Sequence, residues 1–142
     1  MKFAHISDTH LGQRQYHLSI REQDIYDALK QAVKKSIEEK VDFVIFSGDI
    51  FNDKRPPNEA ILLLMQQLIL LKSNNIQSYF ILGDHDKPKE KANSIAWLYS
   101  MTDNSHYIGD GEPTKFGNVL IIGLDHHDEG KDRDLLLEKF KE

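Results

Sequence analysis

The sequence contains no cysteine, and this absence excludes two kinds of chemistry. A chain without thiols forms no disulfide bonds and holds no metal ion through thiolate ligands. Any metal site in this protein must therefore be built from carboxylate and imidazole groups.

Basic residues are in short supply relative to acidic ones. The chain has 18 Lys and Arg against 23 Asp and Glu, which gives a net charge of -5. No broad basic surface is therefore expected to attract nucleic acid or acidic lipid. A polyanionic substrate would have to be held locally or through cations.

Long apolar runs are missing as well. No stretch approaches about 18 uninterrupted apolar residues, the length of a membrane-spanning helix. The start, MKFAHISD, lacks the basic segment and apolar core of a signal peptide. We therefore expect a soluble, cytoplasmic protein, associated with the nucleoid if the source is prokaryotic. With 142 residues, 39% of them hydrophobic, the chain fits one domain over residues 1–142.

The sequence does contain short apolar runs that alternate with longer periodic segments. Four runs have the length and the β-branched or aromatic content of buried strands: residues 2–7, 41–47, 76–82 and 118–124. Three segments have helical spacing: residues 21–39, 58–73 and 91–100, with a last short helix expected over 131–141. Asn58 is the expected cap of the second helix. This alternation predicts an α/β fold, with a parallel-containing sheet and crossover helices.

Each of the first three predicted strands ends in a polar cluster. Asp8 and His10 follow the first strand, Asp49 the second, and Asp84 and His85 the third. The carboxyl ends of parallel strands open on one edge of a sheet, so these side chains should converge. Carboxylates crowded in this way repel one another unless a cation lies among them. An oxygen-rich set with imidazole suits manganese, iron or zinc, and favours manganese.

A simpler interpretation exists for every one of these residues taken alone. An Asp after a strand is more often a turn or capping residue than a ligand, and a lone His is usually a satisfied polar group. The shared location of three clusters is what favours a metal site. His5 lies inside the first predicted strand and is expected to be structural.

The ordered clusters D-x-H, G-D and G-[ND]-H-[DE] resemble those of the calcineurin-like metallophosphoesterase superfamily. Within it, MKFAHISDTHLG, the REQD helix and VDFVIFSGDIF with the following RP resemble the Mre-type, SbcD-like nucleases of double-strand-break repair. The resemblance implies the N-terminal part of a β-sandwich flanked by helices. It also implies a hydrolase, a DNA phosphodiesterase that uses two divalent cations, first of all Mn²⁺, to activate the attacking water. The implied partners are DNA and an ABC-type coiled-coil ATPase.

The resemblance also assigns roles to individual residues. Four positions would bind metal: Asp8, His10, Asp49 and Asp84. Asp49 would bridge both ions, and His85 would be the catalytic histidine beside the scissile phosphate, able to protonate the leaving oxygen. Asp86 would hold the imidazole of His85 in one tautomer.

Several basic residues lie beside these clusters and are candidates for holding a DNA backbone: Lys54, Arg55, Lys87, Lys89 and Lys91. The equally good alternative is that they belong to an ordinary solvated loop.

The chain also departs from the family pattern. Asp84 stands where the family usually has Asn, which should tighten metal binding but lower the net charge of the metal pair. Asn52 stands where a histidine is common. The further histidines of the family would come later, so we expect the domain to be truncated before its last metal-binding strands. His126 and His127 are the late candidates, the alternative being a solvated loop. We therefore expect the chain alone to bind at most one divalent ion tightly and to be weakly active or inactive.

Two other functions stay open at this point. The chain could act on small phosphoesters, or it could be an inactive fragment of the nuclease that only dimerises. We expect a homodimer through helices 58–73 and 91–100, because Leu63 and Leu70 lie outside the apolar face that packs on the sheet. The residues expected on that packed face are 61, 64, 65, 68 and 71.

Overall fold

The computed structural model describes residues 1–86 and 102–126. The predicted helices over 91–100 and 131–141 lie outside this part of the chain. Among the helices that the structure does describe, none has the length and apolar character needed to cross a membrane.

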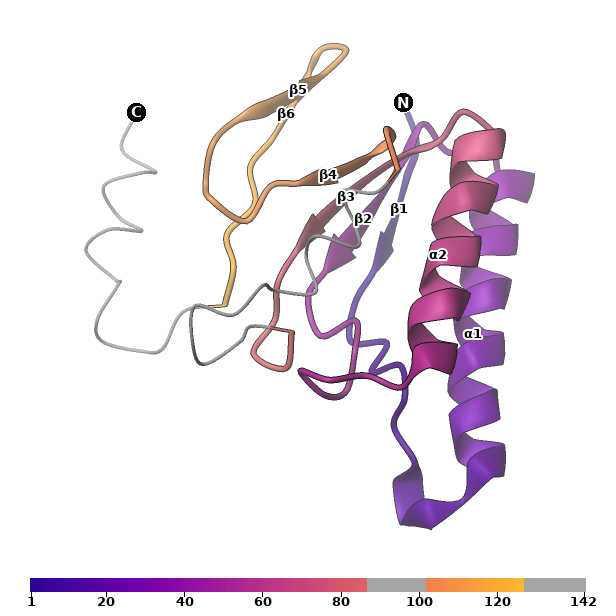
Figure 1. The fold of residues 1–142 in the computed structure, drawn as a ribbon. Helices are drawn as coiled ribbons and strands as arrows, with labels where there is room; N and C mark the ends of the chain where they lie inside the picture. Colours follow the sequence, from indigo (N-terminus) through magenta and orange to yellow (C-terminus); the bar gives the residue numbers. More distant parts are fainter. Residues whose placement is uncertain (87–101, 127–142) are drawn as a thin grey trace.

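The centre of the fold is a four-stranded parallel sheet (Figure 1). Its strands stand in the order β1-β2-β3-β4, which span Phe3–Ile6, Phe43–Ser47, Gln77–Ile81 and Ser105–Tyr107. Helix α1, Ser19–Glu38, joins β1 to β2, and helix α2, Asn58–Ser73, joins β2 to β3. The predicted α/β fold with a parallel sheet and crossover helices is confirmed.

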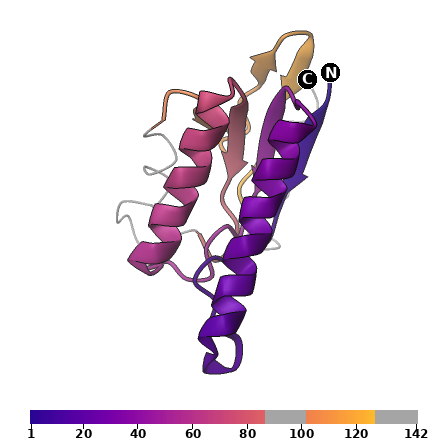
Figure 2. The same ribbon diagram turned by 90° about the vertical axis from the view of Figure 1, so that its right-hand side faces the viewer.

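The two helices lie side by side on one face of this sheet (Figure 2). Side chains alternate between the faces of a strand. Val44 and Phe46 therefore join the core under the helices, whereas Phe43 faces the other side with Tyr79 of β3. Each large side chain buried in this way stabilises the fold by roughly 1.5–3 kcal/mol.

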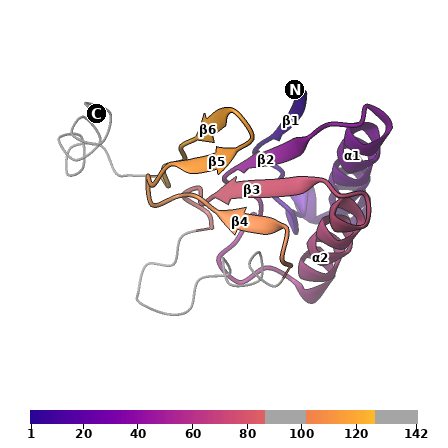
Figure 3. The same ribbon diagram turned by 90° about the horizontal axis from the view of Figure 1, so that it is seen from above.

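The opposite face is covered by a hairpin of β5, Thr114–Phe116, and β6, Val119–Ile121 (Figure 3). The fourth apolar run thus does form a strand, but an antiparallel one in a separate two-stranded sheet. Gly117 and Asn118 make its two-residue turn, with φ at +57° for Gly117. The fourth strand of the main sheet is instead β4, which sequence analysis missed because SHY is too short and too polar to stand out.

Helix α2 differs from its prediction at two points. Asn58 is the first helical residue rather than the cap, a position that Pro57 takes without a side-chain bond. Leu63 is only 6% exposed and belongs to the core, so the prediction that it is exposed was wrong. The reason is that α2 packs against both α1 and β3, which makes its buried face wider than one stripe.

Candidate metal centre

The polar clusters lie level with one another at the carboxyl edge of the sheet. The register pairs Ile6 with Phe46 and Phe46 with Phe80, so β1, β2 and β3 end side by side. Pairing continues past the strands, where the His10 N–H donates to the Asp49 carbonyl at 3.0 Å. The Asp8 N–H likewise donates to the Gly48 carbonyl at 3.2 Å. The parallel topology therefore brings the loops after β1, β2 and β3 together at one edge of the sheet.

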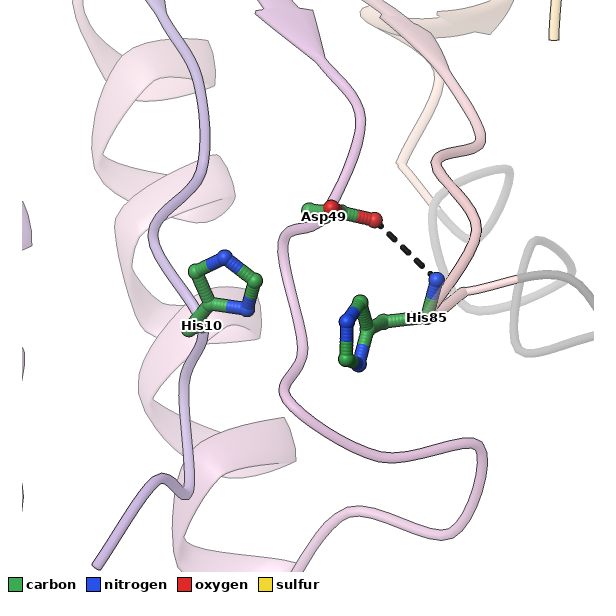
Figure 4. Close-up of side chains that lie close together, drawn as sticks. All are labelled: His10, Asp49 and His85. Carbon is green, nitrogen blue, oxygen red and sulfur yellow. Dashed lines mark hydrogen bonds between the residues drawn. The ribbon is translucent and has the colours of Figure 1, made fainter. Parts of the chain in front are cut away.

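Three side chains meet there closely enough to share a cation (Figure 4). One ligand atom from each of His10, Asp49 and His85 lies within 4.8 Å of the other two. The two imidazole rings have their centroids 5.1 Å apart and stand nearly perpendicular, at 89°. Each of the three residues follows a different strand, as the sequence predicted.

Two glycines allow this approach. A Cβ on Gly83 would lie 2.0 Å from the Asp49 Oδ1 and 2.3 Å from the Asp49 backbone nitrogen. A Cβ on Gly48, whose φ is +81°, would lie 2.8 Å from the Gly83 nitrogen. The ends of β2 and β3 thus come into contact only because neither position carries a side chain.

The ring of His85 is oriented by a backbone group. Its Nδ1 lies 2.7 Å from the Asn52 carbonyl oxygen, and its own backbone N–H donates to the Asp49 Oδ1 at 3.1 Å. A carbonyl only accepts hydrogen bonds, so Nδ1 carries the proton and Nε2 has the lone pair when the ring is neutral. Asn52, which stands where the family commonly has a histidine, therefore orients the His85 ring through its main-chain carbonyl.

Asp86 has a different partner set from the predicted one. Its carboxylate is buried and accepts the backbone N–H groups of Ile50, Phe51 and Gly83 at 3.0–3.2 Å. Burial raises the pKa of Asp86 above its ordinary value, and the three backbone bonds oppose that rise. Asp86 thus ties the loop after β2 to the loop after β3, while the Asn52 carbonyl orients the imidazole.

His10 provides an independent indication that a cation fits. Its Nδ1 is buried and, in the part of the chain that the structure describes, has no hydrogen-bond partner. A buried polar atom without a partner is unfavourable, and a metal ion would satisfy it. Two imidazoles and one carboxylate are ligands that manganese, iron and zinc all accept.

The structure does not bring every predicted residue into this group. Asp8 and Asp84 are exposed on the adjacent loops and lie outside the set of three. The ring of His5 on β1 bonds to the Ser47 hydroxyl on β2. His126 is exposed, and its backbone N–H donates to the Leu82 carbonyl at 2.9 Å.

The described part of the chain includes only two of the five predicted DNA-binding residues. Lys54 and Arg55 are exposed on the loop between β2 and α2. The remaining candidates lie outside the described residues: Lys87, Lys89 and Lys91, together with the late histidine His127.

Comparison with known proteins places the chain in a family. The sequence pattern of calcineurin-like phosphoesterases matches residues 1–139. The DNA double-strand break repair protein Mre11 of Methanocaldococcus jannaschii is 40% identical over 147 residues, covering 99% of this chain and 38% of that protein. Mre11 of Sulfolobus acidocaldarius is 50% identical over 136 residues, covering 89% of this chain and 34% of the relative. The chain thus spans little more than a third of these relatives, and it belongs to the calcineurin-like phosphoesterase family.

Proposed function

We propose that this chain provides the N-terminal part of the active site of a divalent-metal-dependent DNA phosphodiesterase that acts in double-strand-break repair. The observation that carries the proposal is the convergence of His10, Asp49 and His85 from three strand ends in a member of this family. The names of the relatives, DNA double-strand break repair proteins, support DNA as the substrate.

The proposed ligands divide between two cations. His10 and Asp49 would hold the first ion together with Asp8, and Asp84 would contribute to the second with Asp49 as the bridge. Mn²⁺ is the ion that we propose. Cations bound there would hold a phosphate group and lower the pKa of a water molecule, so that hydroxide is available to attack the phosphorus.

His85 would then serve the leaving group. Its Nδ1–H donates to the Asn52 carbonyl in both the neutral and the charged ring. Nε2 can therefore gain or lose a proton without any rotation of the side chain. An imidazole held in a fixed orientation is suited to protonate the ester oxygen that leaves.

A comparison of two substrates tests this function. We expect Mn²⁺-dependent cleavage of an oligonucleotide by a longer protein that contains this chain, and little cleavage by the 142-residue chain itself. Within the described part of the chain, only Asp49 and Asp84 are proposed as ligands of the second cation, and both ions are needed for efficient catalysis. Hydrolysis of nitrophenyl phosphate by the longer protein, with the oligonucleotide left intact, would instead support the small-phosphoester alternative.

We also propose that α2 forms a homodimer contact, with an ABC-type coiled-coil ATPase as a further partner of the complete protein. The exposed apolar side chains of α2 are Leu62, Ile69 and Leu70, which replace the predicted pair of Leu63 and Leu70. An exposed apolar stripe of this kind usually meets a partner.

Light scattering at micromolar concentration tests the dimer. The double variant Leu62→Glu with Ile69→Glu should be monomeric and folded, because both side chains are already exposed. Leu120→Glu is the matched control, since Leu120 is exposed on β6 and away from α2. A wild-type chain that is monomeric at this concentration would refute the dimer.

A further inference from the structure

Leu82 opens the loop that carries His85, and its main-chain N–H and carbonyl both bond to the segment after β6. The Leu82 N–H donates to the Asp125 Oδ1 at 2.8 Å, and the Leu82 carbonyl accepts the His126 N–H at 2.9 Å. Leu82 directly precedes Gly83, so whatever fixes Leu82 also fixes the start of the turn over residues 84–86. Asp125 therefore acts on this turn through the main chain.

Asp125 is itself held on several sides. Its Oδ2 accepts the Tyr107 hydroxyl at 2.6 Å, and its backbone N–H donates to the Gly109 carbonyl at 3.0 Å. A Cβ on Gly109 would lie 1.8 Å from the Asp125 Oδ1, so only glycine leaves room for the carboxylate there. The pKa of Tyr107 is raised by burial and by its bond to Asp125, which keeps the hydroxyl protonated as a donor.

The loop from Leu82 to Asp86 is thus fixed by three carboxylates. Asp125 accepts the N–H of Leu82, Asp86 that of Gly83, and Asp49 that of His85. Asp49 belongs to the candidate metal group, and Asp86 is buried within the loop's own contacts. Asp125 is the one that comes from the segment after β6, which bonds to the ends of both β3 and β4.

We infer that Asp125, oriented by Tyr107, is a positioning residue for His85; this inference rests on the proposed role of His85. Both oxygens of Asp125 already accept a hydrogen bond, which suits a positioning role better than metal binding. Without the carboxylate, the Leu82 N–H would lose its acceptor and the loop its first fixed point. The bond from the His85 N–H to Asp49 and the ring contact with Asn52 should then loosen.

Three variants of the 142-residue chain test this inference. Asp125→Ala removes both bonds, and Tyr107→Phe removes only the orienting hydroxyl. Asp125→Asn is the conservative variant, because its amide oxygen can still accept the Leu82 N–H and its NH₂ can donate to the Tyr107 oxygen. The matched control is His106→Phe, which deletes the 2.7 Å contact between the ring of His106 on β4 and the side chain of Gln77 on β3. This contact also joins β3 to β4, but it lies nearer the amino end of β3 than Leu82 does.

The readouts are amide hydrogen exchange at His85, the protonation of its ring nitrogens by ¹⁵N NMR in metal-free protein, and Mn²⁺ affinity by calorimetry. We expect Asp125→Ala to speed His85 amide exchange and to lower the fraction of the His85 ring that is protonated at Nδ1. Mn²⁺ affinity should change little, because His85 serves the leaving oxygen in the proposed function. Tyr107→Phe should act in the same direction but less, and Asp125→Asn should resemble the wild type. His106→Phe should leave His85 unchanged.

Changes confined to Leu82 exchange and to thermal stability would overturn the inference, since they would show that Asp125 is merely structural. If Asp125→Ala does not fold, Tyr107→Phe decides, and unchanged His85 exchange in that variant would be the overturning result. A wild-type chain that fails to bind Mn²⁺ while His85 still responds to Asp125 would count against the proposed function alone.

Discussion

Replacing His85 with alanine is expected to reduce Mn²⁺-dependent DNA cleavage by about 100- to 10,000-fold, the usual contribution of a general acid. Mn²⁺ affinity should stay nearly unchanged, because in the proposed mechanism His85 serves the leaving oxygen. Its Nδ1 is already committed to the Asn52 carbonyl, which leaves Nε2 for that single task. The measurements are single-turnover cleavage of an oligonucleotide by the longer protein and calorimetric titration with Mn²⁺.

The same pair of measurements separates two roles for this residue. His85 is close enough to His10 and Asp49 to bind the ion itself, and in that case affinity would fall together with cleavage. His5→Ala is the control, because it deletes a histidine of β1 that bonds to Ser47 rather than to the group of three. Undiminished cleavage by the His85 variant would contradict both roles.

Replacing Asp49 with asparagine is expected to weaken Mn²⁺ binding by at least about 100-fold, more than is usual for loss of a residue that only supports a ligand. Folding stability should change little. Asparagine keeps an oxygen for the His85 N–H and tolerates the left-handed backbone of Asp49, whose φ is +48°. The substitution therefore removes the negative charge and little else.

Titration of the 142-residue chain with Mn²⁺, alongside thermal unfolding, checks this expectation. Asp103→Asn makes the same charge change on an exposed side chain paired with Lys72, just before β4 and so at the opposite edge of the sheet. Equal Mn²⁺ affinity in the wild type and the Asp49 variant would remove Asp49 from the site. A large fall in unfolding temperature would show that its charge serves folding instead.

The sequence was sufficient for the part of the fold that carries the site. β2 is an almost continuous apolar run, FVIFS, as expected for a strand of a parallel sheet that is covered on both faces. β1 and β3, FAHI and QSYFI, include polar residues but still stand out through their β-branched and aromatic side chains. β4 has no such run, since it is short and lies at the edge of the sheet. Its position is decided by contacts with Ser78, Tyr79 and Phe80, which the local sequence does not reveal.

The same division holds within the site. His10, Asp49 and His85 could be predicted because topology alone brings strand ends together. The bonds of His85 to the Asn52 carbonyl, and of Asp86 to three backbone N–H groups, could not, because main-chain groups are the same at every residue. Asp125 did have a signal, since it follows an apolar run just as the first three clusters do.

Asp8, His10 and Asp49 share a backbone property, with φ values of +54°, +43° and +48°. In this region a residue with a side chain is less stable than glycine by roughly 1–2 kcal/mol. A library at these positions, selected only for resistance to heat, should therefore accumulate glycine and asparagine. Selection for metal binding should preserve aspartate and histidine. Efforts to make the protein more robust should leave these three codons fixed and seek their gains elsewhere in the chain.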